Sequence, residues 1–146
     1  MAIIGGGPGG GGPIGSGNPF TGTASTIEAM GGGIWGGWSG KQEPNNSSVE
    51  AFNFLSPNKG LIVELGWVAD FNTLTAGRSV NMEVKLSGTV VAFMKGQLTS
   101  AGDFPVSFPY NFPGLVIPAN SEVVITVGTN EDAAVDQYVT IVAREI

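Results

Sequence analysis

The sequence predicts an all-β fold, an antiparallel β-sandwich over residues 41–146 that follows an extended Gly-rich arm over residues 1–40. Three observations predict it. Apolar and polar residues alternate with a period of two in several segments, turn-forming residues separate these segments, and no segment after residue 41 carries an apolar stripe with the period of a helix. Six to eight short strands in a stretch of this length are typical of a sandwich, whose core is large enough to fold independently.

The clearest alternation lies at residues 79–86, where Val80, Met82 and Val84 fall on one face of the strand and Asn81 falls on the other. The same period recurs toward the C-terminus. Two further segments are continuously apolar, as strands buried on both faces are. In chain order the expected strands are 49–55, 61–69, 79–86, 89–94, 121–129 and 137–146, of which 61–69 and 89–94 are the continuously apolar ones.

Prolines and turn residues delimit these strands. Pro105, Pro109 and Pro113 interrupt the stretch 104–117 and predict short edge pieces or loops there, because proline cannot donate to a β-ladder. Clusters of Gly, Pro, Asn and Ser predict turns. These clusters lie at 56–60, 76–77, 87–88, 118–120 and 128–130.

The first forty residues have a different composition. They hold 16 of the 24 glycines and a single charged residue, Glu28, so they cannot offset their own chain entropy by building a core. Sparse bulky residues, among them Ile34, Trp35 and Trp38, favour an arm that docks on another surface over a disordered terminus, because tryptophans are costly to leave in water. Residues 23–30 are expected to form one or two helical turns.

Composition also excludes several function classes. The formal net charge of −6 argues against a nucleic-acid-binding surface. The lack of both Cys and His excludes disulfides, His- or thiolate-bound metals, and Ser-His-Asp or Cys-His catalysis within the chain. No run of about 18 apolar residues predicts a membrane-spanning helix. We therefore expect no enzyme, no cofactor, no metal, no nucleic acid and no membrane.

Several motifs resemble functional sites but lack the required context. The G-x-G-x-x-G pattern at residues 5–10 is followed by Gly and Pro rather than by a helix, so no dinucleotide site is expected. Glu64 and Glu83 lie in strand segments with no sign of a facing partner carboxylate. Trp67 is expected in the core rather than on a sugar-binding face. The acidic segment 130–136 predicts a solvated hairpin loop, with Ca²⁺ binding by its carboxylates as the alternative.

The segment 114–146 resembles the last strand pair of jelly-roll proteins from bacteriophage virions. In those proteins an Ile-Pro-Ala turn, here at residues 117–119, leads into an alternating strand, a polar loop and a final strand. The segments 48–72 and 79–92 are similar to the earlier strands of such domains. The resemblance is to head decoration (cement) and minor capsid proteins. It implies a jelly-roll sandwich on the capsid surface of a virion, a homotrimer, and the major capsid protein as partner.

Two surfaces follow as candidate sites. Ile34, Trp35 and Trp38 are expected to anchor the arm on the capsid. An apolar rim is expected to join the subunits of a trimer, because a chain with 12% charged residues has too little charge to cover a monomer surface. The rim residues are Phe104, Phe108, Tyr110 and Phe112. The alternative function is a carbohydrate- or receptor-binding β-sandwich module of a phage tail or fibre, which predicts exposed aromatic side chains.

Overall fold

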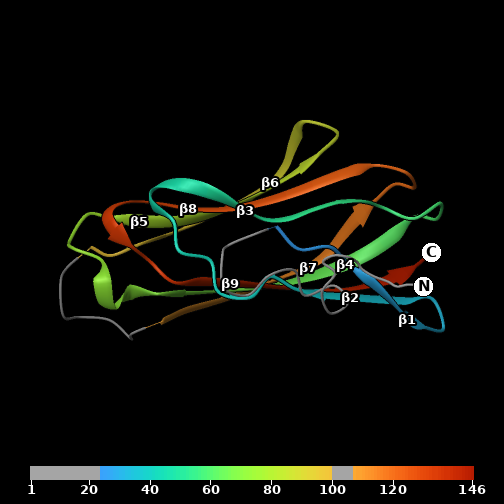
Figure 1. The fold of residues 1–146 in the computed structure, drawn as a ribbon, viewed down its shortest axis with the longest axis horizontal. Helices are drawn as coiled ribbons and strands as arrows, with labels where there is room; N and C mark the ends of the chain where they lie inside the picture. The colour runs from blue at the N-terminus through green and yellow to red at the C-terminus, as the bar shows by residue number, and fades with distance from the viewer. Residues whose placement is uncertain (1–23, 100–106) are drawn as a thin grey trace.

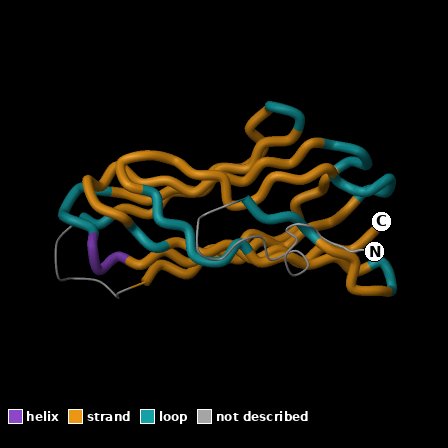
Figure 2. Tube along the Cα trace, in the orientation of Figure 1, coloured by secondary structure: helices purple, strands orange, loops and turns teal. Residues whose placement is uncertain are grey.

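The computed structural model describes residues 24–99 and 107–146, which form two antiparallel sheets packed face to face (Figure 1). The five-stranded sheet has the order β1-β2-β9-β4-β7 and the four-stranded sheet the order β3-β8-β5-β6. A short 3₁₀ helix, η1 (Phe71–Thr73), follows β4 at one end of the sandwich (Figure 2). The strands are β1 (Glu28–Gly31), β2 (Ile34–Trp38), β3 (Asn45–Leu55), β4 (Leu61–Asp70), β5 (Ser79–Leu86), β6 (Thr89–Gln97), β7 (Ser107–Ile117), β8 (Glu122–Ala134) and β9 (Gln137–Glu145).

Strands β2 to β9 have the connectivity of a jelly roll. β2 pairs with β9, β3 with β8, β4 with β7, and β5 with β6. The chain is thus one long ribbon of four antiparallel pairs, and successive pairs alternate between the two sheets. Closure of a double sheet in this way is the jelly-roll arrangement. The predicted fold class, an antiparallel β-sandwich of jelly-roll type, is confirmed.

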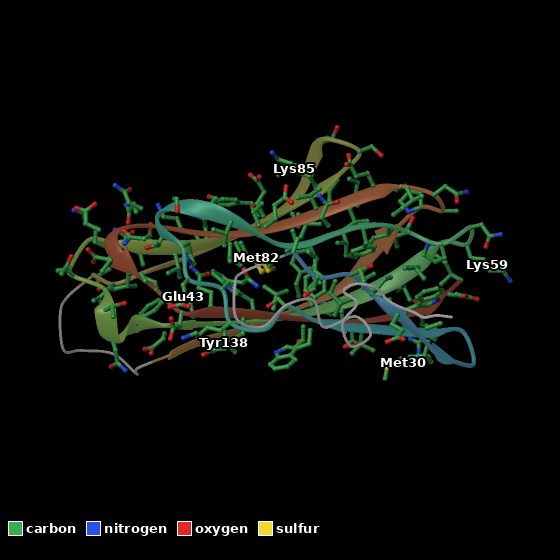
Figure 3. All side chains as sticks on the ribbon, in the orientation of Figure 1. Met30, Glu43, Lys59, Met82, Lys85 and Tyr138 are labelled. Atoms are coloured by element: carbon green, nitrogen blue, oxygen red, sulfur yellow. The ribbon has the colours of Figure 1, made fainter. Side chains whose placement is uncertain are left out.

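The inward faces of both sheets build a single core. In β5 the predicted alternation holds, since Val80, Met82 and Val84 are fully buried, and Figure 3 shows Met82 between the two layers. In β4 the buried residues again occupy every second position, with Trp67 as the largest. Among the described residues, no helix is long and apolar enough to cross a membrane.

The sandwich begins earlier in the chain than the sequence predicts. Ser25 forms a parallel bridge with Phe52 of β3, and β1 and β2 extend the five-stranded sheet. Residues 24–40, assigned above to the arm, therefore belong to the folded domain, and the described part of the segment expected to be helical, 24–30, forms a bridge and β1 instead. The backbone partners that place this segment come from β3 and β9, which no local pattern reveals. Residues 1–23 lie outside the described residues.

Two later strands are longer than expected. β7 is continuous in spite of Pro109 and Pro113, because an edge strand pairs on one side only and tolerates the missing donors. β8 runs through the turn expected at 128–130 and into the segment expected to be a loop, ending at Ala134. The prediction of a turn at 128–130 is therefore wrong.

Candidate functional site

The outer face of the five-stranded sheet exposes several large apolar side chains. It consists of the side chains that alternate with the buried ones on β4 and β9, together with neighbours on β1, β2 and β7. We call this surface the outer face. Its members are Met30, Ile34, Trp38, Ile62, Glu64, Val68, Asp70, Val116, Tyr138, Thr140, Val142 and Arg144. Figure 3 shows Met30 on the side of this sheet that faces away from the other layer.

Several large apolar side chains of the outer face are exposed to solvent. Five of the ten exposed large hydrophobic residues among the described ones lie there: Met30, Trp38, Val68, Val116 and Val142. Val142 is 56% exposed although it lies on β9, an interior strand of the sheet. Scattered apolar residues are normal on a protein surface, but a contiguous group across neighbouring strands marks an interaction site.

The strand register brings these residues together. Ile34 of β2 and Ile62 of β4 flank Arg144 of β9 on its two sides, and Glu64 is opposite Val142. These five side chains, with Pro113 and Gly114 of β7, line a shallow depression of about 210 Å³. Small-molecule sites usually enclose about 300–1,000 Å³. The geometry thus fits a macromolecular contact better than a small ligand.

Two opposite charges lie within this apolar surface. Glu64 and Arg144 occupy neighbouring strands, two residues apart along the register. Among the described residues, neither side chain has a hydrogen-bond or ion-pair partner. On the four-stranded sheet the corresponding central position is different, because Glu83 is paired with Lys85 at 3.6 Å.

The three predicted anchors, Ile34, Trp35 and Trp38, do not share one face. Ile34 and Trp38 lie on the outer face, and Trp38 is 49% exposed. Trp35 points the other way, packs against the core, and donates from Nε1 to Glu145 Oε2 at 3.0 Å. β2 therefore presents two of the three side chains to a partner and uses the third to hold itself to the sandwich.

The predicted rim of Phe104, Phe108, Tyr110 and Phe112 is only partly within the described structure. Phe104 lies outside the described residues. Phe108 and Tyr110 are on β7, opposite Ala69 and Trp67. Phe112 is half-buried and packs against the core, so it offers little surface to another subunit.

The candidate carboxylates are separated by the fold. Glu64 is on β4 in the five-stranded sheet and Glu83 is on β5 in the four-stranded sheet. Both alternate with buried residues of their strands, so they point away from the core on opposite sides of the sandwich. They cannot act together on one substrate. Trp67 is buried, as predicted, and is not part of a sugar-binding face.

The acidic segment 130–136 is not the predicted solvated loop. Glu131 lies in β8 and is buried, and its Oε2 accepts hydrogen bonds from the backbone N–H of Thr75 at 2.7 Å and from its hydroxyl at 2.9 Å. The bond from the Thr75 backbone is the main cause that lowers the pKa of Glu131 below its ordinary value. Asp132 instead contacts Asn46 and Arg78. No group of three or more acidic side chains in the described part of the chain is arranged to hold a metal ion, and the carboxylates of Glu131 and Asp132 have different partners.

The sequence pattern did not predict a buried network of polar side chains. Gln137 of β9 accepts from Trp67 Nε1 at 2.9 Å and donates from Nε2 to the carbonyl of Gly128 on β8, also at 2.9 Å. It thereby ties the two sheets together. The outer face was missed as well, although a signal existed: in β9 both alternating sets contain apolar residues, such as Val139 on one side and Val142 on the other.

Comparison with known proteins supports the fold. No protein-family model and no curated protein matches the sequence. A structure of infectious bursal disease virus, Gx strain, matches with a TM-score of 0.50 and 13% identity, over 77% of this chain and 32% of that chain. The VP2 subviral particle of the same virus matches with a TM-score of 0.47, 13% identity, and the same two coverages.

This chain thus spans about a third of the length of the solved chains that it matches. At such low identity, the likeness to the Gx-strain structure establishes the fold alone: this chain is a β-sandwich of the type found in a viral particle.

Proposed function

We propose that this chain is a structural protein of a virion that binds and stabilises a capsid surface, as a decoration or cement protein does. The observation that carries the proposal is the jelly-roll sandwich, similar over 77% of the chain to a solved virus structure with a TM-score of 0.50. The sequence resemblance of residues 41–146 to phage decoration and minor capsid proteins adds to it. The apolar outer face also suits a protein that works in an assembly.

Within this proposal, residues 1–23 contact the major capsid protein. They contain glycines, which let a backbone approach a partner surface closely, and sparse apolar side chains at Ile3, Ile4, Ile14 and Phe20. Addition of an extended segment to a sheet edge of the partner would supply main-chain hydrogen bonds. We place this element before residue 24 rather than up to residue 40, because β1 and β2 belong to the sandwich.

Binding to undecorated virus particles tests the proposal. A protein that lacks residues 1–23 keeps every described strand, so it should unfold at the same temperature as the full chain while its affinity for particles falls at least about tenfold, or about 1.4 kcal/mol. A full-length variant with Ile3→Ser and Ile4→Ser should show a smaller loss in the same direction. No binding of the full-length protein would refute the virion role, and unchanged binding of the shortened protein would refute the role of the segment.

A carbohydrate- or receptor-binding module of a phage tail or fibre is the second candidate function. One observation favours it: Trp38 is half-exposed, and Tyr138 lies diagonally across the β2–β9 pairing, because Trp38 is opposite Thr140. Two aromatic rings at such spacing offer a platform for a sugar. Binding of soluble oligosaccharides that is lost through Trp38→Ala and unaffected by removing residues 1–23 would favour this function.

A further inference from the structure

We infer that the outer face is the contact surface for a second copy of this chain, related to the first by a two-fold axis. The inference does not rest on the virion role, because it follows from the chemistry of the face alone. It is a route to self-association separate from the predicted aromatic rim, of which Phe112, the member whose side chain is described, packs partly against the core.

The first argument is the position of the exposed apolar side chains. On the four-stranded sheet they lie at the periphery, with Val90, Val91 and Phe93 on the edge strand β6 and Leu55 at the last position of β3. The outward residues of its central strand β5 are polar, as at Asn81 and Glu83. On the five-stranded sheet the interior strands themselves expose Val68 and Val142. A layer that covers the middle of this sheet would therefore bury exposed apolar side chains, which the other sheet carries at its edges.

The second argument is charge complementarity. A two-fold interface brings the same patch of both copies together, so residue i of one copy meets residue j of the other twice. Glu64 and Arg144 are unpaired within the described chain and lie near each other on the face. An axis in the plane between the two stacked sheets, perpendicular to the line from Glu64 to Arg144 and passing above its midpoint, places each Glu64 opposite the Arg144 of the other copy. Ile62 and Val142 lie on either side of that line, so the same rotation brings each of them near its own counterpart.

The size of the face is adequate. Nine residues each of β9, β4 and β7 and the five residues of β2, at about 4.8 Å between strands and about 3.3 Å per residue, give a footprint of roughly 500 Å². A standard protein interface buries about 800 Å² of accessible surface on each partner, and accessible area exceeds the flat footprint. A strongly charged partner is disfavoured, since the centre of the face carries one charge of each sign.

The full-length protein tests this inference by sedimentation velocity and light scattering between about 1 and about 100 µM, where complexes of weak to moderate affinity dissociate on dilution. Val142→Lys should raise the dissociation constant of the dimer at least about tenfold, because it buries an unpaired charge. The matched control is Phe93→Lys on the four-stranded sheet, since Phe93 and Val142 are both 56% exposed. The control should leave the dimer unchanged.

A charge swap gives a readout that misfolding cannot imitate. Glu64→Arg and Arg144→Glu should each weaken the dimer, because like charges then meet across the axis. The double variant restores opposite charges and should dimerise within about threefold of the natural protein. Circular dichroism confirms the fold of each variant.

Several results would overturn the inference. They are a monomer over the whole concentration range, a trimer, an equal effect of Val142→Lys and Phe93→Lys, or a double swap that fails to restore association. A monomer in which cross-linking joins residues 1–23 to the outer face would assign this surface to that segment instead. None of these results bears on whether the protein binds virus particles, so the two proposals fail separately.

Discussion

Strands β2 and β9 lie side by side in the same sheet, yet they become strands for different reasons. β9 alternates strictly, with Val139, Ile141 and Ala143 buried and the residues between them outside. β2 has the sequence Ile-Trp-Gly-Gly-Trp and no usable alternation. The structure holds β2 through its neighbours, because Gly37 lies against Phe52 of the opposite sheet and Trp35 bonds to Glu145 of β9. β2, whose sequence has no regular alternation, thus takes its conformation from contacts with residues distant in the sequence.

The end of β8 also depends on contacts with residues distant in the sequence. Its first half alternates, with Val123, Ile125 and Val127 buried. Its second half, from Asn130 to Ala134, is polar and reads as a loop, but the buried Glu131 is held by Thr75 in the connection before β5. Mutations can therefore test separately how much the alternating strands and the strands held by distant contacts contribute to stability.

The largest effect is expected where a side chain of β9 bonds to the other sheet. Gln137→Leu removes a buried side chain that serves both Trp67 Nε1 and the carbonyl of Gly128. Each buried group that loses a partner costs about 1–3 kcal/mol, so the free energy of unfolding should fall by about 2–4 kcal/mol in urea denaturation. The control is Gln97→Leu, whose exposed amide bonds only to Gly77 within the described residues. That change should stay within about 0.5 kcal/mol, and an equal loss in both variants would contradict the cross-sheet role.

A smaller effect should appear in β2, where two adjacent glycines differ in their surroundings. A Cβ at Gly37 would lie 2.9 Å from the Phe52 ring and 3.0 Å from the carbonyl of Thr26, whereas at Gly36 it would meet the flexible end of Met30. Gly37→Ala should therefore lower the free energy of unfolding by about 1–3 kcal/mol through overpacking. Gly36→Ala should be nearly neutral, because the Met30 side chain can move. If thermal unfolding showed equal stability for the two variants, close packing would not be what places β2.

The smallest effect at neutral pH concerns the end of β8, and it depends on pH. Hydrogen bonds, first from the Thr75 backbone, lower the pKa of Glu131 from its ordinary value of 4.5. A carboxyl group whose pKa is lower in the folded state stabilises the fold above the unfolded pKa, and this contribution disappears as pH falls through the folded pKa. Glu131→Gln should therefore be less stable than the natural protein at pH 7, and the difference should shrink below about pH 4.5.

Urea denaturation from pH 7 to about pH 3 measures this difference. Glu122→Gln, at an exposed position of the same strand, is the control and should follow the natural protein throughout. A difference between Glu131→Gln and the natural protein that stayed constant over this range would show that the Thr75 contacts do not depend on the charge.

The sequence by itself determined the all-β class, the alternating strands and the absence of Cys and His chemistry. These properties are local: a period of two shows which residues share a face, and residue types limit the available chemistry. The bounds of β5 were predicted without error, since Ser79–Leu86 has an uninterrupted alternation between two turns.

Only the tertiary structure decided where the domain begins, how β7 and β8 run, and which apolar face remains exposed. β2 is a strand because β9 offers it backbone partners, β1 pairs in turn with β2, and Glu131 lies in a strand because Thr75 accommodates its carboxylate. In β9 both alternating sets of residues contain apolar side chains, so the sequence does not show which set faces the core and which faces outward. That choice depends on which sheet covers each face, and this information exists only once strands far apart in the chain have been brought together.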